Sequence, residues 1–354
     1  MTDLRLGLAL LALCLAAPGT ARAEAAPRLA SVSATLETEN VEIDPDDPAI
    51  WVNPADPAQS RVIGTDKDVG LVVFDLDGRI VQRLPDGRLN NVDIRQDVTL
   101  GGETLTLVTA SRRNDDTIVF YTVGADGTLS RATPFAFPGA PRAIADDIYG
   151  IGLHHDAVAD RLFVIASFKT GEIMQWEVTR ADGRLALRFA RELAVPTQPE
   201  GVVADDALGF IYVGEEDGGL WRFAAAPDAD PAGYLVDAVG SACLPEDDLE
   251  GLAIVQTPGN GGYVLASAQG VNRYVLYARQ PDADGRQPCY GAFDIGTGAT
   301  DPVSETDGLD VTTTPLSPRF PRGLLVVQDD RNEGFSRNFK YVSWTAVKDA
   351  LTLD

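Results

Sequence analysis

The chain has 354 residues, with 53 Asp and Glu against 29 Lys and Arg and a formal net charge of −24. So much negative charge disfavours nucleic acid or an anionic membrane surface as a partner, because both would repel it. The length exceeds what one compact two-layer core holds, so we expect two domains or a closed repeat architecture.

Residues 1–23 have the pattern of a secretory signal peptide. Arg5 precedes an apolar run from Leu6 to Ala17, and the small-x-small ending Ala21-Arg22-Ala23 follows. The apolar run is about a dozen residues, short of the roughly 18 or more that a spanning helix needs, and no later segment comes close. We therefore expect a secreted or periplasmic protein, residues 24–354, without a membrane span.

From about residue 40 onward, stretches rich in Val, Ile, Tyr, Phe and Trp alternate with Gly, Asp, Asn and Pro turns, and helical periodicity is almost absent. The chain is therefore predicted to be all-β. A unit of strand, polar tip and strand recurs six times, as RVIGTDKDVGLVVFDLDGRI, TLVTASRRNDDTIVFYTVGADGTL, RLFVIASFKTGEIMQWEVTRADGRL, GFIYVGEEDGGLWRF, GYVLASAQGVNRYVLYARQ and GLLVVQDDRNEGFSRNFKYVSW. The tips are spaced by roughly 46 to 60 residues, which is typical of propeller blades. The prediction is one domain, a six-bladed β-propeller.

The polar tips occupy equivalent positions in the six units. In a propeller, tips between inner strands gather at one end of the central channel. Six side chains far apart in the sequence should then form one shallow ring, although ordinary turns are polar as well. The tip residues are Lys67, Arg113, Lys169, Glu216, Gln269 and Asp329.

Both ends of the repeat region carry further predicted elements. The stretch DPDDPAIWVNP, which precedes the first unit, is expected to supply an outer strand to the last blade and so close the ring. The tail TAVKDALTL is expected to form a short helix.

Two cysteines remain after signal cleavage, Cys243 and Cys289, because Cys14 lies within the signal peptide. An even count in an exported protein favours a disulfide between them, although two separate thiols remain an alternative. Neither begins a C-x5-R phosphate loop.

Other catalytic motifs are also missing. The only histidines, His154 and His155, are adjacent and lie outside an RHGxRxP context, and there is no G-x-S-x-G elbow and no Walker loop. Zinc or binuclear iron hydrolysis normally uses several histidines, so it is disfavoured.

Carboxylates instead occur in short clusters along the chain. Crowded at one end of a channel, they would repel each other unless cations neutralised them. Oxygen ligands without nitrogen or sulfur favour Ca²⁺, which can activate a water molecule and screen an acidic substrate. The alternative is that the acids serve solubility. The clusters comprise Asp46 and Asp47, Glu200, Glu215 to Asp217, Asp247, Asp248 and Glu250, and Asp301, Glu305, Asp307 and Asp310.

Ten segments in order, from about residue 41 to residue 345, resemble the successive blocks of β-propeller phytases. They are DPDDPAIWVNP, GTDKDVGLVVFDLDG, LNNVDIR, IYGIGLHH, PEGVVADDALGFIYVGEEDGGLWRF, DDLEGLAI, YVLASAQG, SETDGLDV, GLLVVQD and NFKYVSW. The resemblance implies a six-bladed propeller that binds several Ca²⁺ ions and removes phosphates from myo-inositol hexakisphosphate (phytate). It also implies a cleavage site beside a second phosphate-binding site.

The resemblance also assigns roles to individual residues. The residues that resemble metal ligands are Asp46, Asp47, Glu200, Glu216, Asp248, Glu250, Asp301 and Asp307. Those that resemble phosphate-holding and catalytic residues are Lys67, Arg113, Tyr149 and Lys169, with Glu200 at the metal and Gln269 facing the same ring. Thr170 departs from the family, many members of which have Glu there, so a weaker calcium site is expected. We further expect a monomer that takes phytate as its calcium complex.

Two other functions fit part of the pattern. A calcium-dependent propeller lactonase would also place acids around a central metal, but it needs no cationic clamp. A non-catalytic propeller that binds a glycan or a protein would have little reason to keep both the carboxylates and the basic tips.

Overall fold

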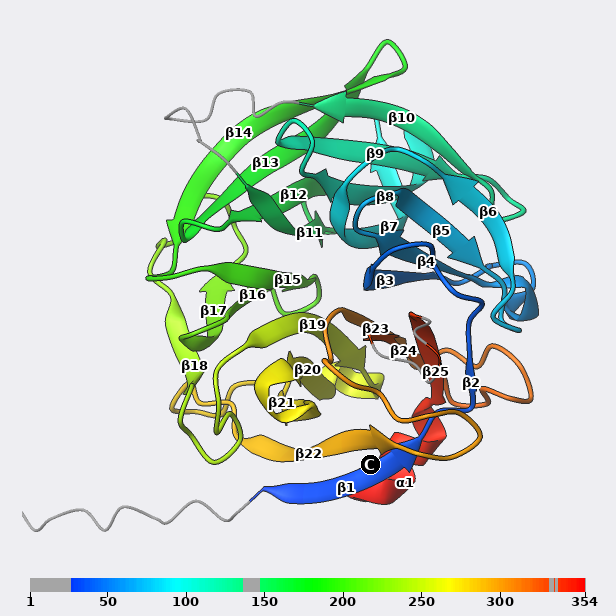
Figure 1. Ribbon diagram of the computed structural model, residues 1–354. Helices are drawn as coiled ribbons and strands as arrows, with labels where there is room; N and C mark the ends of the chain where they lie inside the picture. The colour runs from blue at the N-terminus through cyan, green and yellow to red at the C-terminus, as the bar shows by residue number, and fades with distance from the viewer. Residues whose placement is uncertain (1–26, 136–146, 331–333, 335–336, 354) are drawn as a thin grey trace, which may run out of the picture.

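The computed structural model describes residues 27–135, 147–330, 334 and 337–353, so the predicted signal peptide lies outside it. In the described part, six sheets stand around a central axis (Figure 1), and the six-bladed β-propeller is confirmed. No helix in these ranges is both long enough and apolar enough to cross a membrane.

The strands of each blade follow one another outward from the axis, and N-terminal strands complete the last two blades. Blade 1 holds β3 (Pro45–Trp51), β4 (Arg61–Asp66), β5 (Gly70–Phe74) and β6 (Ile80–Leu84), and blade 2 holds β7 (Leu89–Leu100), β8 (Glu103–Arg112), β9 (Thr117–Val123) and β10 (Leu129–Phe135). Blade 3 holds β11 (Ile148–Asp156), β12 (Arg161–Phe168), β13 (Glu172–Ala181) and β14 (Arg184–Ala194), and blade 4 holds β15 (Pro199–Asp205), β16 (Phe210–Glu215), β17 (Gly219–Ala224) and β18 (Tyr234–Ala238). Blade 5 holds β19 (Leu249–Gln256), β20 (Gly262–Ala268), β21 (Arg273–Ala278) and β22 (Cys289–Gly296), and blade 6 holds β23 (Leu309–Thr312), β24 (Leu324–Asp329) and β25 (Asn338–Ser343).

The N-terminal segment closes the ring. β1 (Arg28–Ser33) pairs in parallel with β22, and β2 (Leu36–Glu37) pairs antiparallel with β25 as the outermost strand of blade 6. The expectation that DPDDPAIWVNP supplies this outer strand was wrong, because its first residues form β3, the inner strand of blade 1. All residues of β3 are buried, which suits a strand packed on both faces but not an outer edge.

The expected C-terminal helix is present as α1 (Trp344–Leu351), which packs on β1 and β22. Its buried residues Trp344, Val347 and Leu351 recur at a helical spacing. Three short 3-10 turns, Pro57–Gln59, Pro258–Asn260 and Gln269–Val271, lie between strands.

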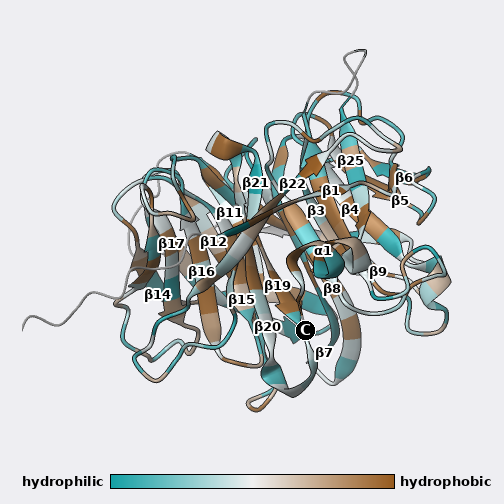
Figure 2. Ribbon diagram, turned by 90° about the horizontal axis from the view of Figure 1, so that it is seen from below, coloured by the Kyte–Doolittle hydropathy of each residue, from teal (hydrophilic) through white to brown (hydrophobic). Residues whose placement is uncertain are grey.

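The apolar core lies between the blades. Within the described residues it divides into six clusters, each formed by two neighbouring blades. Between blades 1 and 6, for example, the rings of Phe74 and Phe339 meet edge to face, 5.9 Å apart. Figure 2 shows apolar residues along the strands and polar residues in the loops at both ends. Because the apolar side chains pack between blades, the axis is left to polar side chains.

Carboxylates accept hydrogen bonds from backbone N–H groups on the inner strands, which line the axis. An inner strand has no partner on its axial side, so its free N–H groups need acceptors. Asp310 Oδ2 accepts from the Ile50 N–H at 2.7 Å, and Asp93 Oδ2 accepts from the Leu153 N–H at 2.7 Å. Part of the acidic composition therefore joins neighbouring blades, and Asp310 is one such residue.

The structure also places a disulfide between Cys243 and Cys289, with an S–S distance of 1.99 Å. It ties the loop between blades 4 and 5 to the outer strand β22. That loop leads into β19, which carries Glu250.

Candidate active site

The inner strands of blades 1 to 5 each contain a register shift near their first residue. Two residues on the inner strand lie opposite one residue on its partner at this point, which is the pattern of a β-bulge. A bulge changes the direction in which a side chain points. The shifts lie between Pro45 and Pro48, Leu89 and Val92, Ile148 and Ile151, Pro199 and Val202, and Leu249 and Leu252.

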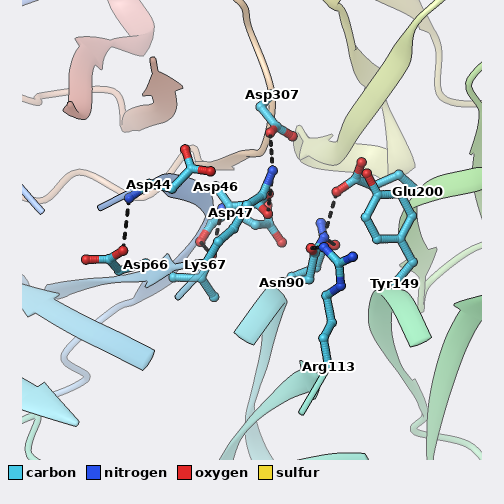
Figure 3. Close-up of polar contacts among 12 residues, drawn as sticks. Asp44, Asp46, Asp47, Asp66, Lys67, Asn90, Arg113, Tyr149, Glu200 and Asp307 are labelled. Atoms are coloured by element: carbon cyan, nitrogen blue, oxygen red, sulfur yellow. Dashed lines mark hydrogen bonds and ion pairs between the residues drawn. The ribbon is translucent and has the colours of Figure 1, made fainter. Parts of the chain in front are cut away.

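These shifts bring equivalent residues from different blades to one end of the channel (Figure 3). The first bulged residue directly follows the first residue of the inner strand in each of these blades. These bulged residues are Asp46, Asn90, Tyr149, Glu200 and Glu250. In blade 6, Asp307 stands shortly before β23 and completes the set. Local backbone geometry, repeated from blade to blade, therefore builds the site.

Glycines after the bulge residues allow neighbouring inner strands to approach closely. A Cβ added at Gly150 would lie 1.7 Å from the Glu200 carbonyl oxygen, and one added at Gly201 would lie 2.3 Å from the Glu250 carbonyl oxygen. Real Cβ atoms do not reach such distances, so side chains are excluded there. The Tyr-Gly and Glu-Gly pairs thus set how near the functional side chains of adjacent blades can lie.

Two groups of carboxylates share Glu200. Asp46, Glu200 and Asp307 offer ligand atoms that lie within 4.8 Å of one another, and so do Glu200, Glu216 and Glu250. Asp46, Glu200 and Asp307 are almost fully buried. Glu216 follows β16 and is half-buried. We call these the first and the second carboxylate group.

The donors of both groups fit a divalent cation. Asp46 Oδ1, Asp307 Oδ1 and Glu250 Oε2 are buried without a hydrogen-bond partner, which is costly for an anionic oxygen. Burial, with the charge of Glu200, raises the pKa of Asp307 and of Glu216 to about 7. Lys67 acts to lower the pKa of Asp307, and the hydrogen bond from Gln198 acts to lower that of Glu216. Carboxylate oxygens without nitrogen or sulfur donors suit hard cations such as Ca²⁺.

Glu200 differs electrostatically from its neighbours. Burial acts to raise its pKa, but the hydrogen bond with Glu250 and the charge of Lys67 act the other way. Hydrogen bonds from Tyr149 and Asn90 add to them, and the net pKa of Glu200 is lowered. The shared carboxylate is therefore the one that remains ionised most readily.

Cations from the tips of blades 1 to 3 flank the carboxylates. Lys67 Nζ lies 3.1 Å from Asp46 Oδ2 and 3.3 Å from Asp307 Oδ2. Lys169 Nζ lies 4.3 Å from the centroid of the Tyr149 ring, and the Arg113 guanidinium lies 5.6 Å from it. Two cations thus lie close to the Tyr149 ring, and their like charges repel unless an anion lies near both.

Three predicted ligands are not members of the two carboxylate groups. Asp47 Oδ2 accepts from the Val92 N–H at 3.0 Å and so joins blade 1 to blade 2. Asp248 is hydrogen-bonded to Glu250, a member of the second group, but is not itself a member. Asp301 instead contacts Lys340, whose fully buried Nζ lies 2.6 Å from Asp301 Oδ1.

That lysine is the centre of a separate cluster at the ring closure. Lys340 Nζ lies 2.5 Å from Glu37 Oε2 and 2.9 Å from Asp329 Oδ2. Asp329 is the last residue of β24, whereas the tips of the other blades directly follow the second strand. The tip of blade 6 is therefore Asp330, one residue later than expected. The Asp330 N–H bonds to the Ser304 carbonyl, as the N–H groups of the other tips bond to the loops before their inner strands.

Gln269 lies at the fifth tip, where its Nε2 donates to the Thr306 carbonyl at 3.1 Å, next to Asp307. Thr170 follows Lys169, and its hydroxyl hydrogen-bonds to Glu172.

Two polar residues at the site escaped the sequence analysis. Gln198 Nε2 donates to Glu216 Oε1 at 2.6 Å, and Asn90 Nδ2 donates to Glu200 Oε1 at 2.8 Å. Asn90 could have been found by aligning the starts of the inner strands, where it corresponds to Asp46 and Glu200. Gln198 offers no comparable signal.

Comparison with known proteins decides the family. The model of the phytase family matches residues 3–354. The chain belongs to the phytase family. It is also 37% identical over 315 residues to the 3-phytase of Bacillus subtilis (strain 168), covering 86% of this chain and 81% of that relative. This phytase is therefore an enzyme, and the resemblance to β-propeller phytases is confirmed, which sets aside the lactonase and the non-catalytic propeller.

Among solved structures, a chain from the crystal structure of BBS1N in complex with ARL6DN, soaked with mercury, matches with a TM-score of 0.44 and 9% identity. The match covers 87% of this phytase and 79% of that chain, and so weak a likeness has no bearing on its function.

Proposed function

We propose that the protein is a calcium-dependent phytase that releases phosphate from myo-inositol hexakisphosphate by attack of a water molecule. One observation carries the proposal. Two carboxylate groups that share Glu200 lie directly beside Lys67, Arg113 and Lys169, so binding positions for cations and for a phosphate ester adjoin each other.

The carboxylates would hold the metal. Asp46, Glu200 and Asp307 would bind one ion, and Glu216 and Glu250 would bind a second together with the shared Glu200. Bound Ca²⁺ supplies positive charge that lowers the pKa of a water molecule and screens the repulsion between the substrate and the acidic channel. For the same reason we expect phytate to bind as its calcium complex.

The basic residues would hold the ester. Lys67, Arg113 and Lys169 would donate charge-assisted hydrogen bonds to phosphoryl oxygens and stabilise the charge that develops in the transition state. Burial, together with the charge of Glu200, raises the pKa of Tyr149, so its hydroxyl keeps its proton and can donate a hydrogen bond. Arg113 and Lys169, which both lie close to the Tyr149 ring, would hold a second phosphate of the same substrate.

Two further proposals concern the form in which the protein acts. Residues 1–23 would be removed as a signal peptide during export to the periplasm or the cell exterior. The exported protein, residues 24–354, would then act as a monomeric single-domain propeller.

The test is phosphate release from phytate by residues 24–354. We expect turnover with Ca²⁺, loss of turnover with excess chelator, and recovery when Ca²⁺ is restored. Glu216→Gln should lower turnover by roughly 10- to 100-fold or more, because it removes a charged ligand. Glu103→Gln, an exposed exchange at the start of β8, is the matched control and should leave turnover unchanged. Full turnover in chelator would refute calcium dependence.

A further inference from the structure

Asn90 occupies the position in blade 2 at which other blades carry an acid. Its side chain is fully buried, and it is the first bulged residue of β7, as Asp46 is in β3 and Glu200 is in β15. At the equivalent places four blades have Asp or Glu and blade 3 has Tyr149, whereas Asn90 is a neutral amide. A neutral residue there calls for a chemical reason.

The amide of Asn90 contacts both a carboxylate and a guanidinium of the site (Figure 3). Asn90 Nδ2 donates to Glu200 Oε1 at 2.8 Å and to Asn91 Oδ1 at 2.8 Å, while Asn90 Oδ1 accepts from Arg113 Nη1 at 3.2 Å. A carboxylate only accepts hydrogen bonds and a guanidinium only donates them. An amide offers a donor to the first and an acceptor to the second, and its orientation is set by these two partners.

The bond to Glu200 contributes little to the packing of neighbouring blades. Asn90 lies in blade 2 and Glu200 in blade 4, with blade 3 between them, so the bond spans the channel end rather than an interface between adjacent blades. The interfaces on either side of blade 3 are held by their own apolar clusters. A bond of this kind is suited to fixing functional groups relative to one another.

We propose that Asn90 is a positioning residue that couples the cation-binding carboxylate Glu200 to the phosphate-binding guanidinium of Arg113. The inference rests on the proposed function. Asn90 sets the direction of Glu200 Oε1 and holds Arg113 beside the carboxylates. An aspartate at this position would face Glu200 with a second negative charge, and an apolar residue would leave both partners without a bond.

The first test is Ca²⁺ binding by calorimetry without phytate, on the wild type and on Asn90→Leu, which keeps the volume and removes the amide. We expect Asn90→Leu to bind Ca²⁺ roughly 10- to 100-fold more weakly, the range seen when a group that orients a metal ligand is lost. Asn90→Ala serves as a second variant if the leucine side chain prevents folding. Ca²⁺ affinity within twofold of the wild type in a folded variant would overturn the proposal.

The second test is a double-mutant cycle on KM for phytate at saturating Ca²⁺. Asn90 should act on the substrate through Arg113, so Asn90→Leu should raise KM in the wild type and have no further effect in an Arg113→Met background. Additive effects on KM would overturn the coupling.

Gln175→Leu is the matched control for both tests. Gln175 is also a fully buried amide, and its Oε1 accepts from Arg191 Nε at 2.7 Å, but it lies on β13 and contacts neither carboxylate group. This variant should lower stability and leave Ca²⁺ affinity and KM unchanged. A wild type that neither binds Ca²⁺ nor releases phosphate would instead refute the proposed function, so the two failures are distinguishable.

Discussion

At the scale of single residues, Lys67 has two roles that act against each other. Its ammonium ion-pairs with Asp46 and Asp307, two of the three members of the first carboxylate group, and about a quarter of its side chain is exposed. It therefore partly neutralises a group that we expect to bind a cation, and it is also one of the residues proposed to bind the ester.

This arrangement gives a prediction for Lys67→Met. Removing a positive charge next to the first carboxylate group should leave Ca²⁺ affinity equal or higher, because Coulomb repulsion of the metal is relieved. Turnover should fall by roughly 10²- to 10³-fold, the range for loss of a group that stabilises transition-state charge. Calorimetry and phosphate release measure the two effects.

Lys348→Met, on α1, is the control and should change neither quantity. Loss of Ca²⁺ binding in Lys67→Met would show instead that the lysine is needed to hold the carboxylates in place.

Asp301 shows where the residues alone were insufficient. It was expected to bind metal because of the motif around it, yet in the structure it faces the buried ammonium of Lys340. Lys340 lies 39 residues further along the chain, and nothing in the local sequence links the two. The packing of the strands therefore determines which positively charged side chain lies next to a given carboxylate.

At the scale of elements, the bulged inner strand is the unit that repeats. Its sequence signature is short: a polar residue followed in blades 3 to 6 by glycine, as in Tyr149-Gly150 and Glu200-Gly201. The glycine lets the next inner strand approach, and the polar residue then meets its counterparts from other blades. This signature is present in the PEG, LEG and TDG motifs of the sequence. The direction in which the polar side chain points depends on the register of the strand, which the motif does not give.

Gly201→Ala tests the importance of this close approach. The added Cβ would lie 2.3 Å from the Glu250 carbonyl oxygen, so β15 and β19 must separate. We expect a loss of stability of about 1–3 kcal/mol, as for other overpacked positions, together with weaker Ca²⁺ binding because Glu200 and Glu250 move apart. Denaturant unfolding and calorimetry measure these effects.

Gly124→Ala is the matched control, since the nearest atom to its added Cβ is a flexible side-chain oxygen of Asp126 at 3.1 Å. If Gly201→Ala behaved like the control, the close contact would have no functional importance.

At the scale of the whole molecule, the channel concentrates acids whose folded-state pKa values are high. Burial raises the pKa of Asp307, Asp310 and Glu216 to about 7, well above their values in an unfolded chain. Between about pH 4 and pH 7 the folded state therefore binds more protons than the unfolded state, and stability falls as the pH rises. His154, whose pKa burial lowers, acts in the opposite sense but is a single group.

We accordingly predict that the melting temperature of the metal-free protein falls from pH 5 to pH 8. Ca²⁺ should raise it more at pH 8 than at pH 5, because the cation binds ionised carboxylates of the folded state. Thermal unfolding with chelator and with Ca²⁺ at both pH values is the measurement. A metal-free melting temperature that rises with pH would contradict the charge distribution described above.

The sequence by itself determined the six blades, the single closed ring and the residue types at one end of its channel. Strand patterns and turn residues are local features of the sequence. Because the same pattern recurs six times, each copy strengthens the prediction of a propeller. Only the tertiary structure decided that Glu200 belongs to two carboxylate groups, that Asn90 in blade 2 bonds to Glu200 in blade 4, and that Asp301 contacts Lys340. The physical reason is that these contacts join side chains from strands and loops that are far apart in the sequence. Their geometry depends on bulge register and on the closeness of neighbouring inner strands, which no local pattern records.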